Sequence, residues 1–216
     1  MDSLQDKHLI YRLGHWATVG RLTASLFHEI NNPMQAIRGA TSLALEDLDD
    51  VESLRTYLEL SLHESDRILS LIARARRVFT LDEVPLAPLD LHTAVSEVLH
   101  LAAKDMSSRR VTVNLQLAPA LPPLLARHNE FSLALLSALF AVSDVLFAGG
   151  GGELTVRSTV NEGFVLLELS AAAHTLGDAD VDLFVCRHLV ERCQGYVEQL
   201  ARDGQWTVCL ALPQAA

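Results

Sequence analysis

The sequence is poor in the residues that would indicate several common classes of protein. It has only three cysteines, which form neither a CxxC pair nor an even set, so neither a disulfide framework nor a cysteine metal site is indicated. Acidic residues outnumber basic ones, and the net charge of −10 argues against nucleic acid or an anionic membrane as the main partner. The longest apolar run, Phe131–Val142, is shorter than the roughly 20 residues of a membrane-spanning helix. We therefore expect a cytoplasmic protein that binds neither nucleic acid nor a membrane.

Glycine and proline are scarce in the first 80 residues, which hold only Gly14, Gly20, Pro33 and Gly39. Apolar residues there recur at steps of three, four and seven, which predicts two long amphipathic helices with a short turn near Asp47–Asp50. A single helical hairpin leaves its apolar stripe half covered. We therefore expect residues 1–82 to form a dimerisation domain, in which two copies of the hairpin make a homodimeric four-helix bundle.

A proline-containing segment, residues 81–89, separates this helical region from a second region of mixed pattern. The second region, residues 88–216, predicts an α/β sandwich with its helices on one face, so the fold class is α+β. The predicted helices are 92–104, 129–147 and 181–193, and the predicted strands are 111–117, 153–160, 164–170 and 206–212. The helix at 129–147 is apolar nearly all round, which predicts that it is buried between layers.

The most informative segment reads His-Glu-Ile-Asn-Asn-Pro, residues 28–33. At about 100° per residue, His28 and Asn32 lie opposite the apolar stripe of the helix, and Glu29 lies on its flank. A neutral imidazole can accept a phosphoryl group when one ring nitrogen is free and the other donates to an acceptor such as Glu29. Asn32 can orient the phosphoryl group or a water. From spacing alone, a solvated histidine beside a proline kink is the commoner explanation, and both interpretations stay open.

The stretch Leu13–Ile37, LGHWATVGRLTASLFHEINNPMQAI, resembles the phosphoacceptor box of two-component sensor histidine kinases of the HisKA type. The histidine, the glutamate, the second asparagine, the proline and the apolar residues after it align without gaps. The resemblance implies that His28 is the phosphoacceptor, Glu29 its acid/base partner and Asn32 the residue that positions the phosphoryl group or water. It also implies a dimeric four-helix bundle, as the apolar stripes do independently.

Residues 88–213 are similar, in the order of their elements, to the ATP-binding domain of these kinases, the Bergerat fold. The motifs that bind nucleotide there have diverged. The two asparagines of the family's N box, which hold magnesium and nucleotide, fall on Ser137 and Ala141, and the aspartate that reads adenine falls on Ala171. The glycines of the later boxes fall on Ala173, Asp180 and Asp182. Alanine offers no oxygen to a hard cation, and carboxylates repel a triphosphate.

We therefore expect a two-component signalling protein that carries a phosphoryl group on His28 and exchanges it with the receiver aspartates of response regulators, without binding ATP. No metal site or cofactor is expected in this chain, and the receiver would supply Mg²⁺. Two alternatives stay open: a histidine kinase core whose diverged ATP site still works, and a non-catalytic pseudokinase adaptor. The start at Met1, close to the first predicted helix, fits a chain with no sensor domain of its own.

Overall fold

The computed structural model describes residues 2–79, 85–172, 180–202 and 204–215, with backbone alone for 2–11 and 180. It divides into two compact units: a hairpin unit, Thr23–Arg77, and a C-terminal unit that comprises Met1–Leu22 and Val78–Ala216. The units thus differ from the predicted domains 1–82 and 88–216 at the N-terminal end. The reason is that the beginning of the first helix packs against the helices of the C-terminal unit.

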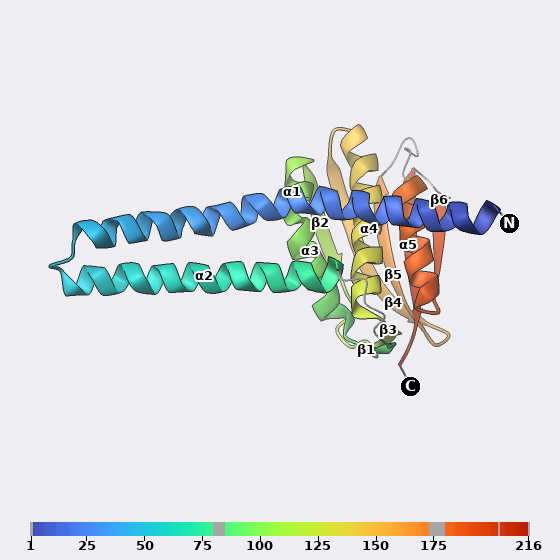
Figure 1. Ribbon diagram of the computed structural model, residues 1–216. Helices are drawn as coiled ribbons and strands as arrows, with labels where there is room; N and C mark the ends of the chain where they lie inside the picture. The colour runs from blue at the N-terminus through green and yellow to red at the C-terminus, as the bar shows by residue number, and fades with distance from the viewer. Residues whose placement is uncertain (1, 80–84, 173–179, 203, 216) are drawn as a thin grey trace. The chain divides into compact units, whose positions relative to one another are not determined.

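Two long helices and a tight turn form the helical region (Figure 1): α1 (Asp2–Glu46) and α2 (Val51–Phe79). The predicted turn is confirmed, and Asp50 caps α2 by accepting hydrogen bonds from the backbone N–H groups of Glu52 (3.1 Å) and Ser53 (3.2 Å). The hydrogen bond from the Ser53 hydroxyl, together with these backbone bonds, lowers the pKa of Asp50. The cap explains why the chain re-enters a helix directly after three acidic residues in four.

Small side chains separate the two helices of the hairpin unit. The buried apolar residues between Thr23 and Arg77 are few, mostly alanines: Leu26, Ala40, Ala44, Leu71 and Ala75. Larger apolar side chains stay exposed along the same unit: Phe27, Met34, Leu43, Leu45, Leu48, Val51, Leu58, Leu60, Leu62, Leu69 and Ile72. One hairpin therefore buries only part of its apolar surface, as the sequence pattern predicted.

The C-terminal unit is built on a five-stranded sheet with three helices on one face (Figure 1). The strand order is β2-β4-β5-β7-β6, with β2 and β4 parallel and every other pair antiparallel. The strands are β2 (Val111–Gln116), β4 (Gly152–Asn161), β5 (Phe164–Ala172), β6 (Tyr196–Arg202) and β7 (Gln205–Pro213). The helices are α3 (Leu91–Ser108), α4 (His128–Ala148) and α5 (Asp180–Arg192).

The core of this unit lies between the sheet and its helices. Strands β4, β5 and β7 alternate buried with less buried residues, so each presents one apolar row to the helices. Helix α4 is buried over nearly its whole length, as its all-round apolarity predicted. By length and composition α4 is apolar enough to cross a membrane, yet 83% of its most apolar window is buried inside the protein, as in the core helix of a globular domain.

Most predicted helices and strands are confirmed, and the differences are local. The predicted linker 81–89 contains the short strand β1 (Ala87–Leu89), which pairs with β3 (Leu124–Ala126) in a separate antiparallel sheet. The sequence analysis missed both of these strands, and it also missed β6. Strand β6 is an edge strand whose residues are mostly exposed and polar, so no apolar alternation indicates it.

Candidate functional site

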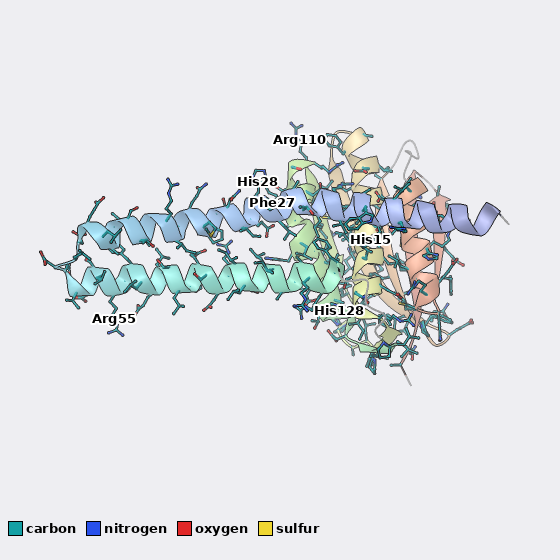
Figure 2. The ribbon with its side chains drawn as sticks, viewed as in Figure 1. His15, Phe27, His28, Arg55, Arg110 and His128 are labelled. Carbon is teal, nitrogen blue, oxygen red and sulfur yellow. The ribbon has the colours of Figure 1, made fainter. Side chains whose placement is uncertain are left out.

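His28 lies on α1, and its side chain is exposed. It projects from the side of the helix that faces away from α2 (Figure 2). Asn32, one turn further on, is exposed as well, whereas Glu29 is half-buried. Residues four apart share one face of a helix. The imidazole and the amide therefore share an open helix face, which a second protein can reach.

The surroundings of His28 combine a helix defect with exposed apolar side chains. Pro33 is buried in the helix interior and has no N–H, so it cannot donate to the carbonyl oxygen of Glu29. Phe27 is 64% exposed and Met34 51% exposed. Large exposed apolar side chains beside a reactive group are typical of a protein-docking surface. The site is thus an exposed imidazole on a helix face that also carries exposed apolar side chains.

Three of the positions at which the resemblance places nucleotide ligands are closed to solvent, and a fourth, Asp182, is half-buried. On α4, Ser137 and Ala141 are fully buried, and Ala171 on β5 is 2% exposed. Ala173 and the side chain of Asp180 lie outside the described residues.

A hydroxyl from α1 contacts two of the diverged positions. Oγ1 of Thr18 lies 3.4 Å from Oγ of Ser137 and 3.5 Å from Oδ1 of Asp182. It also lies 3.0 Å from the carbonyl oxygen of Gly14, one turn earlier on the same helix. Thr18 is 1% exposed. The beginning of α1 therefore lies directly over the helix face that the resemblance assigns to nucleotide.

A cluster of two arginines and two aspartates, the charge cluster, lies beside this contact: Arg21, Asp105, Arg109 and Asp144. The Arg21 guanidinium donates to both carboxylate oxygens of Asp105 (2.8 and 3.2 Å) and to Asp144 (3.0 Å). Arg109 contacts the same two carboxylates from α3's C-terminal cap. Bidentate pairs of this kind are the stronger form of ion pair. Asp144 on α4 is thus held by two cations of the chain itself.

Burial and charge act on the ionisable groups here in opposite directions. Burial raises the pKa of Asp182 against the attraction of Arg21, so its carboxyl is harder to ionise than in water. Burial alone lowers the pKa of Arg21, but its hydrogen bonds and charge interactions with Asp105 and Asp144 outweigh this, so its pKa is raised. The guanidinium also lies 3.9 Å from the centre of the Phe140 ring, a cation–π contact.

These residues do not fit a magnesium–nucleotide complex. Ala141 has no ligand atom, the hydroxyl of Ser137 contacts Thr18, and Asp144 is already paired with Arg21 and Arg109. Among the described residues, no three His, Cys, Asp or Glu side chains are grouped so that they could hold a metal ion.

The sequence analysis did not single out the α1 residues that cover this face. Gly14, Thr18 and Arg21 follow one another at steps of four and three, which places all three on one side of the helix. Gly14 is required by close packing: a Cβ there would lie 2.3 Å from Cγ2 of Val185. This row of a small, a hydroxyl and a basic residue is the only sequence signal that one side of the helix packs against another element. It does not identify the partner, because Asp105, which binds Arg21, lies more than 80 residues away.

Residues 18–83 match the family description "His Kinase A (phospho-acceptor) domain". Two curated relatives match across most of the chain. The "Sensory histidine kinase/phosphatase NtrB" of Rhizobium meliloti (strain 1021) is 29% identical over 185 residues, 85% of this chain and 46% of the relative. The "Sensor histidine kinase ZraS" of Escherichia coli (strain K12) is 20% identical over 194 residues, 90% of this chain and 40% of the relative. This chain is related to the two-component sensor histidine kinases. It spans less than half the length of these two curated relatives.

Solved structures of the family share the fold. The "Acinetobacter baumannii histidine kinase AdeS" superposes with a TM-score of 0.54 at 12% identity, over 88% of this chain and 98% of that one. The "Catalytic domain of histidine kinase ThkA" also gives 0.54, at 10% identity, over 61% of this chain and 98% of that one. The predicted order, a HisKA helical hairpin followed by a domain like the kinase catalytic domains, is therefore confirmed.

Proposed function

We propose that this chain is a histidine phosphotransferase of two-component signalling, which carries a phosphoryl group on His28 and exchanges it with the receiver aspartates of response regulators without using ATP. The observation that carries the proposal is a contrast inside one chain. The phosphoacceptor motif is present on α1, with His28 and Asn32 exposed. By contrast, Ser137, Ala141 and Ala171, at positions assigned to nucleotide, are buried and offer a single hydroxyl among them.

The transfer itself needs little from this chain beyond positioning. One ring nitrogen of His28 attacks the phosphorus of the receiver's aspartyl phosphate, a P–N bond forms, and the P–O bond to the aspartate breaks, which frees the carboxylate. Glu29 holds the proton on the other ring nitrogen and stabilises the charged ring, and Asn32 positions the phosphoryl oxygens. The receiver supplies the Mg²⁺. In-line transfer of this kind is catalysed mainly by alignment and charge neutralisation.

The same geometry supports a homodimer and a docking site for the receiver. The apolar side chains left exposed along the hairpin unit are too many for one copy to cover, and pairing two hairpins into a four-helix bundle buries them. Phe27 and Met34, beside the phosphoacceptor face, are kept out of this dimer contact in the proposal and offer the receiver an apolar contact. A cytoplasmic location, without membrane or nucleic-acid binding, stays a prediction of the sequence.

A kinase with a diverged but working nucleotide site is the second candidate, because the two relatives above are named as histidine kinases. It differs from the first in one measurable property. A kinase binds Mg-ATP and labels His28 from it, whereas the proposed phosphotransferase does neither. Calorimetry with Mg-ATP on the full chain therefore separates the two, and micromolar affinity would support the kinase.

The experiment that tests the phosphotransferase uses purified full chain and phosphorylated receiver domains. The chain is expected to discharge the receiver's aspartyl phosphate and to gain 80 Da on His28 by mass spectrometry (the mass of one HPO₃ group). His28→Ala should abolish the gain in mass. His63→Ala removes an exposed histidine from α2 of the same unit and is the matched control, which should transfer at the wild-type rate.

Discharge by wild type but equally by His28→Ala would contradict the proposal. No discharge with any of several receivers, together with binding to one of them, would favour the non-catalytic adaptor.

A further inference from the structure

In the C-terminal unit, helix α1 covers the side of helices α3, α4 and α5 that points away from the sheet. This side is here called the helix-layer face. The cover is the segment Gly14–Arg21, here called the docking segment, and it belongs to the same compact unit as the face. Its contacts reach all three helices: Gly14 meets Val185 of α5, Thr18 meets Ser137 of α4, and Arg21 meets Asp105 of α3.

Helix α4 gives the physical reason for a cover. It is apolar all round, and the sheet buries only one side of it. Helices α3 and α5 flank it, so a side facing away from the sheet still needs a partner. Phe140, on that side, is fully buried beneath the guanidinium of Arg21. The docking segment therefore covers this ring.

The contacts fall on the positions that have diverged. Ser137 has replaced one N-box asparagine, and its hydroxyl meets Thr18. Asp182 has replaced a glycine, and its carboxylate lies within reach of the same threonine. Asp144 pairs with Arg21. Two of the residues that differ from the family's nucleotide ligands, Ser137 and Asp182, are thus also partners of Thr18 on α1.

We infer that the former nucleotide face of this chain is an intramolecular docking surface for the segment Gly14–Arg21, held by Thr18 and by the charge cluster of Arg21 with Asp105 and Asp144, and that this segment and a nucleotide exclude each other. The inference concerns the C-terminal unit alone. It holds or fails whether or not His28 carries a phosphoryl group.

Engineered cysteines at Thr18 and Ser137 test the docking directly. Their hydroxyl oxygens lie 3.4 Å apart, so cysteine sulfurs at these positions come within reach of a disulfide. The full chain with Thr18→Cys and Ser137→Cys should form an intramolecular disulfide rapidly under mild oxidation. Ala17→Cys with Ser137→Cys is the matched control, because Ala17 is exposed on the other side of the same helix turn. It should crosslink at least 10-fold more slowly.

A charge reversal tests what holds the segment. Arg21→Glu in the crosslinking background should slow disulfide formation at least 10-fold, because it places a carboxylate against Asp105 and Asp144. Arg12→Glu is the control for charge, since Arg12 is exposed on the same helix, and should leave the rate unchanged. The native thiols interfere little: Cys186 and Cys193 are buried, and burial raises the pKa of Cys193 and of Cys209 to about 11.

Equal crosslinking of the Ala17 and Thr18 pairs would overturn the inference, because it would mean that the segment is not docked by one face. An unchanged rate with Arg21→Glu, in a chain that keeps its circular dichroism spectrum, would overturn the role of the charge cluster. A disulfide that joins two chains, visible as a dimer on a non-reducing gel, would contradict docking within one chain.

Discussion

The phosphoacceptor face of α1 and the helix-layer face of the C-terminal unit differ in two respects: whether the family's motif residues are present, and whether solvent reaches them. The first keeps the residues of its motif and is open to solvent around His28. At the second, the positions that the resemblance assigns to nucleotide ligands carry Ser137 and Ala141, and both are buried. A phosphotransferase needs an exposed histidine but no nucleotide. The proposed function would therefore keep the histidine motif and would not need the nucleotide ligands. The comparison shows that a face without the nucleotide-binding motif can also be closed to solvent.

The largest expected effect comes from the acid/base partner on the exposed face. Glu29→Gln keeps the size of the side chain but removes the negative charge that stabilises the protonated imidazole and can exchange its proton, so transfer from a phosphorylated receiver should slow by about 100-fold. Glu46→Gln, an exposed carboxylate further along the same helix, should leave the rate unchanged. Rapid-quench kinetics with a phosphorylated receiver measures both. A wild-type rate for Glu29→Gln would remove Glu29 from the mechanism.

The helix-layer face can be tested by restoring a side chain that could bind a magnesium nucleotide. Ala141→Asn puts an amide into a fully buried position, where overpacking and the unpaired amide together should cost about 3 kcal/mol. For a chain of this size that lowers the Tm by roughly 6–12 °C. Ala148→Asn, at the exposed end of the same helix, should change the Tm little. A stable Ala141→Asn variant that binds Mg-ADP in calorimetry would show instead that the face is open.

Two glycines on α1 allow a paired test of the cover. Gly14→Ala drives a Cβ into Val185, and the strain should exceed the gain in helix propensity, so the Tm should fall by about 2–4 °C. Gly20→Ala meets nothing within 4 Å and gains about 1 kcal/mol of helix propensity, so the Tm should rise by a similar amount. Differential scanning calorimetry of both gives the comparison. Equal stabilisation by the two alanines would mean that Gly14 is not packed.

The smallest expected effect is a pH dependence at Asp182. Because its pKa is raised in the folded chain, its contribution to stability is full below the unfolded pKa and is lost as the pH rises through the folded pKa. Asp182→Asn should therefore raise the Tm by about 1–2 °C at pH 7, with the gain fading towards pH 4. Thermal melts across this range check it. A gain that persists unchanged at pH 4 would point to packing instead of charge.

Local pattern was sufficient for much of the fold, and it also led to the candidate phosphoacceptor site. Apolar periodicity predicted both long helices, the buried helix α4 and the central strands, because each buries a regular row of side chains. His28, Glu29 and Asn32 could be found for a similar reason: their motif is contiguous, and one helix turn brings it together.

The features that sequence reasoning missed depend on distant partners. Strand β1 lies in a proline-containing segment and is a strand only because β3 pairs with it. The role of Arg21 depends on Asp105 and Asp144, which are 84 and 123 residues away in the sequence. A helical arginine looks the same in sequence whether it faces water or an acidic pair. Tertiary contacts of this kind carry no local signal, and they change which unit the first 22 residues join.

One measurement compares the two faces in the same sample: phosphorylation of His28 from two donors, ATP with Mg²⁺ and a phosphorylated receiver domain, followed by intact mass spectrometry. The account predicts that His28 gains 80 Da (one HPO₃ group) from the receiver within minutes and nothing from ATP at millimolar concentration. Phosphorylation of His28 by ATP alone would contradict it, because the helix-layer face would then still bind nucleotide and the chain would be a kinase.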